Sequence, residues 1–225
     1  MKTGTLAERL QQVKDALPHG IKLIAVSKTR TTEEIKALYD QGQRAFGENY
    51  PQELRDKQPL LPSDIEWHFI GHLQGNKVKY IAPFVHLVHG ADSERLLDEL
   101  NKRAERAQRT IGVLLQVHIA QEETKHGFSP DELRALFRGT DIRGRWPALR
   151  VRGLMGMATN TDDHAQVQRE FGGLAALLKE LQGTGVLPAG QFNELSMGMS
   201  GDLKEALAAG STMVRIGTAI FGPRG

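Results

Sequence analysis

Short apolar runs alternate with longer amphipathic stretches from one end of the chain to the other. Eight of these runs are rich in branched aliphatic residues and are bounded by turn residues, as buried strands are. They are residues 21–28, 44–49, 66–71, 85–90, 112–119, 151–158, 192–198 and 213–217. Within them the apolar positions follow one another more often than they alternate with polar ones, so the runs predict parallel strands covered on both faces.

The stretches between these runs have the pattern of amphipathic helices with recognisable ends. A Thr-x-x-Glu capping box and a closing glycine delimit residues 31–42. A Ser-Pro-Asp-Glu start and a second closing glycine delimit residues 129–139. Residues 93–109 and 167–181 each place their leucines on one face. These stripes predict helices that pack against a sheet.

Eight strands separated by helical stretches predict an α/β fold, a closed (β/α)8 TIM barrel, with residues 5–17 as an extra N-terminal helix. An open, doubly wound sheet is the alternative, because the number of strands alone does not distinguish the two. The shortest segments of the alternation are residues 75–81 and 85–90. No linker, low-complexity tract or block of charge divides the chain, so we expect residues 1–225 to form a single domain.

The composition is that of an ordinary soluble globular protein. Of 225 residues, 40% are hydrophobic and 25% are charged, and 29 Lys and Arg against 27 Asp and Glu leave a net charge of +2, which does not suggest a nucleic-acid-binding protein. The absence of cysteine excludes disulfides, thiolate metal sites and a cysteine nucleophile, and fits a reducing compartment. No segment approaches the roughly 18 apolar residues of a membrane span, and the polar N-terminus is no secretory signal. We therefore expect a cytoplasmic protein that binds no membrane.

A lysine stands at the place where a barrel carries its chemistry. Active sites form at the carboxyl ends of the strands, and phosphate groups are often held by the loops after the seventh and eighth strands. The first predicted strand ends at Lys28, and the seventh runs into a turn of serines and glycines, residues 196–202, before a short helix at 203–209. Such a turn offers backbone N–H groups and the positive end of a helix dipole to an anion. In a closed barrel the eighth strand lies beside the first, so an amine next to a phosphate site points to pyridoxal phosphate (PLP) held as a Schiff base.

The eighth strand carries a charged residue inside an apolar run. Arg215 lies between Val214 and Ile216, so its guanidinium needs a buried partner. Gly217 and Thr218 follow it and offer a close backbone approach and a hydroxyl to the same anion.

Seven motifs together resemble the pyridoxal phosphate homeostasis protein family. They cover essentially the whole chain, in order, and the last two together with the lysine motif are the most specific. The motifs are KLIAVSKT (22–29), FGENY (46–50), WHFIGHLQGNK (67–77), KHGF (125–128), RGLMGMA (152–158), LSMGMSGDL (195–203) and STMVRIGTAIFG (211–222). That family is similar in fold to the barrel domain of alanine racemase, among the fold-type III PLP enzymes.

The resemblance implies six cofactor-binding residues. They are Lys28, Asn49, Ser200, Arg215, Gly217 and Thr218. Lys28 would form the internal aldimine, and Ser200, Gly217 and Thr218 would hold the phosphate. Asn49 would contact the ring or its substituents. The arginine would face the pyridine nitrogen, where a cation disfavours ring protonation and weakens PLP as an electron sink.

Three functions are compatible with such a barrel: a non-catalytic PLP protein that buffers, carries or delivers the cofactor to PLP-dependent apo-enzymes, a PLP-dependent amino-acid racemase, and a binder of another phosphorylated metabolite. The joint motifs argue against the third. Racemisation needs a second acid/base group, and alanine racemase takes it from a C-terminal domain of the partner subunit. This sequence stops eight residues after Gly217, so we expect no such domain here. Tyr39, Tyr50 and Tyr80 occupy helical or loop positions. We expect the homeostasis role, without enzymatic turnover and as a monomer, with Lys125 a surface lysine or, alternatively, a transient second anchor for PLP.

The eight histidines do not predict a metal site. His68 and His72 are four residues apart and His86 and His89 three apart, but both pairs fall on or beside strands, and we expect no carboxylate to cluster with them. His68 and His118 are predicted to be packed or hydrogen-bonded residues of the barrel.

Overall fold

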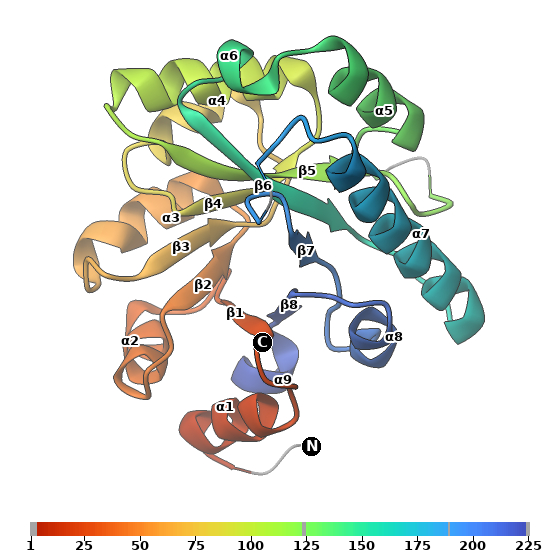
Figure 1. Ribbon diagram of the computed structural model, residues 1–225. Helices are drawn as coiled ribbons and strands as arrows, with labels where there is room; N and C mark the ends of the chain where they lie inside the picture. Colours follow the sequence, from red (N-terminus) through yellow and green to blue (C-terminus); the bar gives the residue numbers. More distant parts are fainter. Residues whose placement is uncertain (1–3, 123–124, 189, 224–225) are drawn as a thin grey trace.

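A barrel of eight parallel strands forms the centre of the computed structural model, which describes residues 4–122, 125–188 and 190–223 (Figure 1). The strands are β1 (Lys22–Val26), β2 (Ala45–Glu48), β3 (Glu66–Phe69), β4 (Leu87–Ala91), β5 (Ile111–Val117), β6 (Leu149–Gly156), β7 (Glu194–Ser196) and β8 (Met213–Ile216). Each strand pairs with the next along the chain, and β8 pairs with β1, so the sheet closes. The predicted barrel is confirmed, and the open sheet is not formed.

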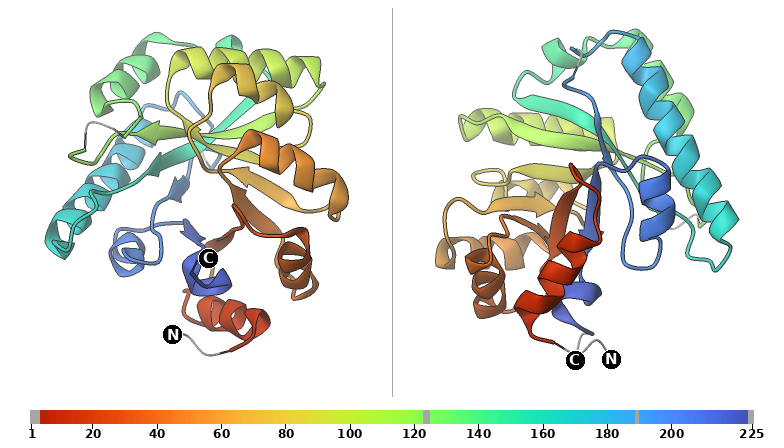
Figure 2. Two further views of the ribbon diagram at one scale, coloured as in Figure 1. Left: turned by 180° about the vertical axis from the view of Figure 1, so that it is seen from behind. Right: turned by 60° about the horizontal axis from the view of Figure 1, so that its bottom comes forward.

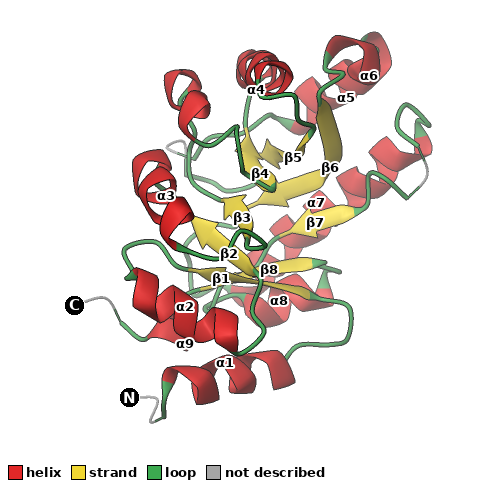
Figure 3. Cartoon of the chain, turned by 90° about the vertical axis from the view of Figure 1, so that its left-hand side faces the viewer, coloured by secondary structure: helices red, strands yellow, loops and turns green. Residues whose placement is uncertain are grey.

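Helices surround the strands on the outside of the barrel (Figure 3). They are α1 (Leu6–Asp15), α2 (Thr32–Asp40), α3 (Pro51–Lys57), η1 (Gln58–Leu60), η2 (Gly75–Tyr80), α4 (Glu94–Arg106), α5 (Pro130–Gly139), α6 (Ile142–Arg145), α7 (His164–Gly183), α8 (Leu203–Ala208) and α9 (Thr218–Phe221), where η marks a 3-10 helix. Both predicted capping boxes form, at Thr31 and at Ser129. No helix of the described chain is long and apolar enough to cross a membrane.

The extra N-terminal helix lies beside the last helix of the chain (Figures 1 and 2). Thr5 caps α1 through a capping box with Glu8. Arg9 of α1 donates from Nε to the carbonyl oxygen of Ile220 in α9, at 2.6 Å. This bond ties the first helix to the segment that follows β8.

The interior of the barrel has an apolar part and a polar part. Leu87, Leu114, Met155 and Met213 form a small buried cluster separate from the large core between the strands and the helices. Because side chains alternate between the two faces of a strand, Arg215 points to the same side as Met213, into the barrel, while Val214 joins the outer core. Polar side chains therefore occupy part of the barrel interior.

Candidate functional site

The predicted site residues lie at neighbouring strand ends. Lys28 follows the end of β1, and Asn49 directly follows β2. β1 pairs with β2 on one side and with β8 on the other, and Ile24 lies opposite Arg215 in the second pairing. The chain leaves β8 at Gly217, so this closing pair of strands places Lys28 between Asn49 and the β8–α9 turn at the carboxyl end of the barrel.

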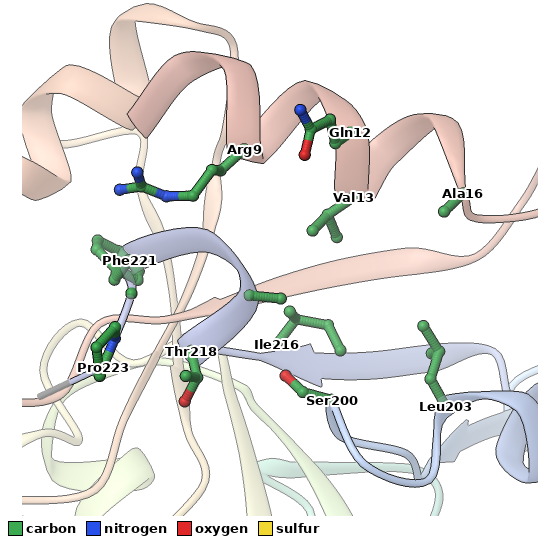
Figure 4. Close-up of a pocket in the computed structure, with 12 residues that line it drawn as sticks. Arg9, Gln12, Val13, Ala16, Ser200, Leu203, Ile216, Thr218, Phe221 and Pro223 are labelled. Carbon is green, nitrogen blue, oxygen red and sulfur yellow. The ribbon is translucent and has the colours of Figure 1, made fainter. Parts of the chain in front are cut away.

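Ser200 and Thr218 line one pocket with a volume of about 740 Å³ (Figure 4). They are the two of the six predicted residues that line it. Helix α1 forms one wall through residues such as Val13, and the β8–α9 segment forms the opposite wall. The two hydroxyl groups that sequence reasoning assigned to a phosphate are thus brought to one cavity from different loops.

The loop that carries Ser200 is fixed by a glycine and an aspartate. Gly198 has φ +98°, and a Cβ at this position would lie 2.6 Å from the Cβ of Ala206 in α8. Glycine is therefore required for the loop to turn closely over the helix. The N–H of Met199 donates to Oδ1 of Asp202 at 2.5 Å, which closes the turn around Ser200.

Arg215 is buried and its partners are oxygen atoms of the barrel. Nη1 donates to the carbonyl oxygen of Ser196 at 2.9 Å and to Oγ of Ser196 at 2.6 Å, and Nη2 donates to the carbonyl oxygen of Gly156 at 3.2 Å. The predicted buried partner is confirmed, but no carboxylate forms an ion pair with this arginine among the described residues. Burial lowers the pKa of Arg215 to about 10, against the opposing charge of Asp202, so the guanidinium stays charged at neutral pH.

A buried ion pair between Lys57 and Glu48 contacts Ser27, the residue before Lys28. Oγ of Ser27 donates to Oε1 of Glu48 at 2.6 Å. Nζ of Lys57, in α3, donates to the same carboxylate oxygen at 2.9 Å and to the carbonyl oxygen of Ser27 at 3.0 Å. Burial raises the pKa of Glu48, and the positive charge of Lys57 opposes that rise. The pair joins the end of β1 to the end of β2.

The residue after Lys28 has a strained backbone. Thr29 has φ +63°, which is rare for a β-branched residue. Its N–H donates to Oε1 of Glu53 at 2.6 Å, and the same oxygen accepts from Nζ of Lys57 at 2.6 Å. The network around Lys57 therefore holds the chain on both sides of Lys28.

Asn49 presents an unsatisfied polar atom. Its side chain is half-buried, and its Oδ1 is buried without a hydrogen-bond partner in the described structure. The preceding strand end is fixed by Glu48, and a Cβ on Gly71 would lie 2.6 Å from the carbonyl oxygen of Asn49, so that glycine lets β3 approach closely. A buried amide atom without a partner at a strand end fits a polar group of a ligand.

Carboxylates do cluster with the histidines, so that expectation is wrong. Nδ1 of His72 lies 3.0 Å from Oδ2 of Asp92, and the ring of His126 stacks on that of His72 with 4.1 Å between centroids. A second group joins Glu66, His68 and His86. The distance along the chain hides the first group in the sequence, whereas Glu66 and His68 are two residues apart on β3 and could have been recognised. Glu66 also pairs with Lys22 at 2.6 Å, so the ammonium group of Lys22 already balances the charge of that carboxylate.

Three further predictions concern single residues: the two histidines His68 and His118, and Lys125. His68 and His118 are hydrogen-bonded as predicted, to Nε2 of His89 and to the carbonyl oxygen of Glu122. Lys125 is half-buried, with 23% of its side chain exposed, and its Nζ donates to the carbonyl oxygen of Ala158 at 2.6 Å and pairs with Glu122 at 2.9 Å.

Sequence reasoning gave no specific role to four buried polar residues near the site, Glu48, Lys57, His89 and Ser196, although it placed Ser196 in the predicted anion-binding turn. His89 carries a signal like that of Arg215, a polar residue inside a predicted strand, whereas Glu48 stands between Gly47 and Asn49 and carries none. Lys57 carries no such signal, because it lies in a polar helical stretch and is buried only by the tertiary fold.

The chain is similar to known proteins over nearly its whole length. The profile of the family described as alanine racemase, N-terminal domain, matches residues 2–225. A pyridoxal phosphate homeostasis protein of Pasteurella multocida is 38% identical over 235 residues, which cover 98% of both chains. PipY of Synechococcus elongatus, solved without PLP, has a TM-score of 0.90 and 36% identity over 97% of this chain and 100% of that chain. The structure of PipY with PLP bound has a TM-score of 0.86 and 35% identity over the same shares.

Proposed function

Because this chain belongs to the pyridoxal phosphate homeostasis proteins, within the alanine racemase N-terminal domain family, we propose that it binds PLP at the carboxyl end of its barrel and serves PLP homeostasis. The observation that carries the proposal is the position of Lys28, between Asn49 and the β8–α9 turn at adjoining strand ends. The crystal structure of the similar protein PipY with PLP bound supports the same ligand.

The residues at this end of the barrel fit PLP. Bound PLP supplies an aldehyde that binds an amine covalently and reversibly. Lys28 is the amine in this proposal, and the hydroxyls of Ser200 and Thr218 hold the phosphate together with the backbone at Gly217. The partnerless amide oxygen of Asn49 is available to a polar substituent of the ring.

Arg215 faces the ring nitrogen in this proposal. It stays charged at neutral pH and can only donate hydrogen bonds. A cationic donor at the ring nitrogen disfavours a proton there and so weakens the cofactor as an electron sink. This favours storage and exchange of the cofactor over turnover.

We place the protein in the cytoplasm as a single-domain monomer that buffers or carries PLP or delivers it to PLP-dependent apo-enzymes, without appreciable catalysis and without a metal. The names of its curated relatives support the homeostasis role.

Absorbance spectroscopy with borohydride trapping tests PLP binding. The purified protein should take up added PLP and absorb visible light, and reduction should fix the cofactor on the peptide that contains Lys28. Lys28→Ala should lose both signals. Lys36→Ala is the matched control, because Lys36 lies exposed in α2, where it pairs with Asp40 and lies over the ring of Tyr39. A wild-type protein that takes up no PLP would contradict the proposal.

An amino-acid racemase is the second candidate, and one tyrosine favours it. The hydroxyl of Tyr39 donates to Asp64 at 2.6 Å, and the ring of Tyr80 lies against the cation of Lys79. Tyr50, in contrast, is 52% exposed and directly follows Asn49. Incubation of the PLP-loaded protein with single amino acids should leave their chirality unchanged. Sustained inversion that Lys28→Ala and Tyr50→Phe both abolish would replace the homeostasis role with the racemase.

A further inference from the structure

A chain of hydrogen bonds crosses the interior of the barrel from Arg215 to the opposite strands. Nη1 of Arg215 donates to Oγ of Ser196 at 2.6 Å, and Nδ1 of His89 lies 2.8 Å from that hydroxyl oxygen. Nε2 of His89 lies 2.8 Å from Nδ1 of His68, whose Nε2 faces Oε2 of Glu66 at 3.9 Å. Ser196 and both histidines are fully buried, and Arg215 is 4% exposed. These hydrogen-bonded residues lie on β8, β7, β4 and β3 in turn.

One order of donors satisfies the contacts of this hydrogen-bond chain and the charge at its far end. Arg215 has no acceptor, so the hydroxyl oxygen of Ser196 accepts from it and the hydroxyl proton is free to reach Nδ1 of His89. His89 then carries its proton on Nε2 and donates to Nδ1 of His68. That leaves the proton of His68 on Nε2, facing the carboxylate of Glu66. The reverse order would aim a lone pair of His68 at that carboxylate, which is unfavourable.

The chain joins a buried cation to a distant anion through neutral groups. Burial lowers the pKa of His68 to about 4 and that of His89 well below its ordinary value, so both imidazoles are neutral at pH 7. Each neutral group turns its electronegative atom toward Arg215 and its proton toward Glu66. Aligned dipoles of this kind stabilise a buried positive charge where no carboxylate lies in contact with it. Glu66 in turn is held by Lys22, and the pair of Arg152 and Glu194 lies on the adjoining strands.

We propose that Ser196, His89 and His68 are positioning residues, which hold the Arg215 guanidinium oriented at the floor of the cofactor site through one directed chain of hydrogen bonds. This chain ends at His68, whose Nε2 has no hydrogen-bond partner in the described structure and faces the carboxylate of Glu66 across 3.9 Å. The inference rests on the proposed function only in that Arg215 meets the PLP ring. The order of donors along the chain is a property of the protein itself and can be tested without PLP.

The tautomers of two histidines test the direction of the chain. Two-dimensional NMR of imidazole nitrogens in the uniformly 15N-labelled protein, without added PLP, should show His68 and His89 neutral and protonated on Nε2 at pH 7. In Ser196→Ala the donor to Nδ1 of His89 is lost, so the resonances of His89 should shift while those of exposed His19 stay unchanged. Protonation on Nδ1 of either buried histidine in the wild-type protein would overturn the proposal.

Two buried serines provide a matched pair for the effect on the cofactor. Ser211 is buried like Ser196, but among the described residues its hydroxyl bonds to backbone carbonyl oxygens alone, with the nearest, that of Met197, at 2.7 Å. Ser196→Ala should weaken PLP binding about tenfold, since a hydrogen bond to a charged group is lost, and should shift the absorbance of bound PLP and its pH titration. Ser211→Ala should leave the spectrum and its titration unchanged.

Glu66, beyond His68 at the end of the hydrogen-bond chain away from Arg215, gives the most specific result. Glu66→Gln should move the absorbance and its pH titration in the same direction as Ser196→Ala, although Glu66 lies on another strand and outside the cofactor site. Equal spectra for the Ser196→Ala and Ser211→Ala proteins, or no change in Glu66→Gln, would overturn the positioning role. If the wild-type protein takes up no PLP, the proposed function fails, and the histidine tautomers still decide whether the directed chain exists.

Discussion

Lys57 is buried at the side of the cofactor site, and the reason lies in what its ammonium group contacts. Its Nζ reaches the carboxylates of Glu48 and Glu53 and the carbonyl oxygen of Ser27. A charge removed from water is tolerated when it has an opposite charge and further hydrogen bonds, and this lysine has both. Its contacts lie on either side of Lys28, so a helix residue fixes the backbone of the residue that we propose binds the cofactor.

Lys57→Met should destabilise the protein by roughly 3–5 kcal/mol, because it leaves Glu48 buried without a counter-charge. Chemical unfolding monitored by circular dichroism measures this loss. Adding Glu48→Gln to Lys57→Met should recover part of it, since the unpaired charge is then removed. Lys36→Met is the control: it breaks the exposed pair with Asp40, whose atoms lie 2.6 Å apart, and should cost under about 0.5 kcal/mol. A loss no larger for Lys57→Met than for Lys36→Met would show that the buried pair has no such role.

Individual elements differ in how far the sequence predicts them. The strands and long helices were predictable because their apolar periods extend over several residues, as in α4 and α7. Helices α3, α6 and α9 were not predicted, because a helix of one or two turns shows little apolar period; α8, equally short, was predicted from the turn before it. The β7–α8 connection was predictable as a turn, but the contact that requires glycine at its start depends on how closely α8 packs.

Gly198→Ala should destabilise the protein by at least about 2 kcal/mol, because the new methyl group meets Ala206 and the backbone has a positive φ. The loop that carries Ser200 should shift, so PLP affinity should fall as well. Gly201→Ala, in the same loop, is the control, because a Cβ there has no atom within 4 Å and stability should stay within about 0.5 kcal/mol. Thermal unfolding with and without PLP separates the two effects. Equal behaviour of the two variants would mean that the loop adapts freely.

At the scale of the whole molecule, closure of the barrel creates side-chain contacts between strands that the sequence did not predict. The alternation of strands and helices predicted closure, and closure placed Lys28 beside the β8–α9 turn as expected. The contacts beyond Arg215 were not predictable, because His89 reaches Ser196 across the barrel from β4, although Ser196 itself lies on β7, the strand beside β8. The neighbours His72, Asp92 and His126 were hidden for the same reason. Local patterns thus predict which residues face the interior, whereas their pairing depends on the register of the closed sheet.

That closed interior should make stability depend on pH. His68 has an ordinary pKa of 6.5, and burial lowers it to about 4. As the pH falls below 6.5, His68 binds a proton in the unfolded chain but stays neutral in the folded protein. Its contribution to the free energy of unfolding is therefore present above pH 6.5 and is lost toward pH 4. Between pH 7.5 and pH 5 the loss from His68 alone is about 2 kcal/mol. The raised pKa of Glu48 acts in the opposite direction near pH 5, so the effect is best isolated as a difference between variants.

Urea unfolding of the wild-type protein and of His68→Gln at pH 7.5, 6 and 5 measures that difference. Glutamine does not titrate, so the gap in unfolding free energy between the two proteins should narrow by about 2 kcal/mol over this range, from whatever value it has at pH 7.5. His19→Gln is the control and should follow the wild-type curve throughout, because His19 is exposed. Parallel curves for the wild-type protein and His68→Gln would show that His68 takes up its proton while the barrel is folded. The neutral imidazoles that carry the directed chain from Arg215 would then not persist below pH 6.5.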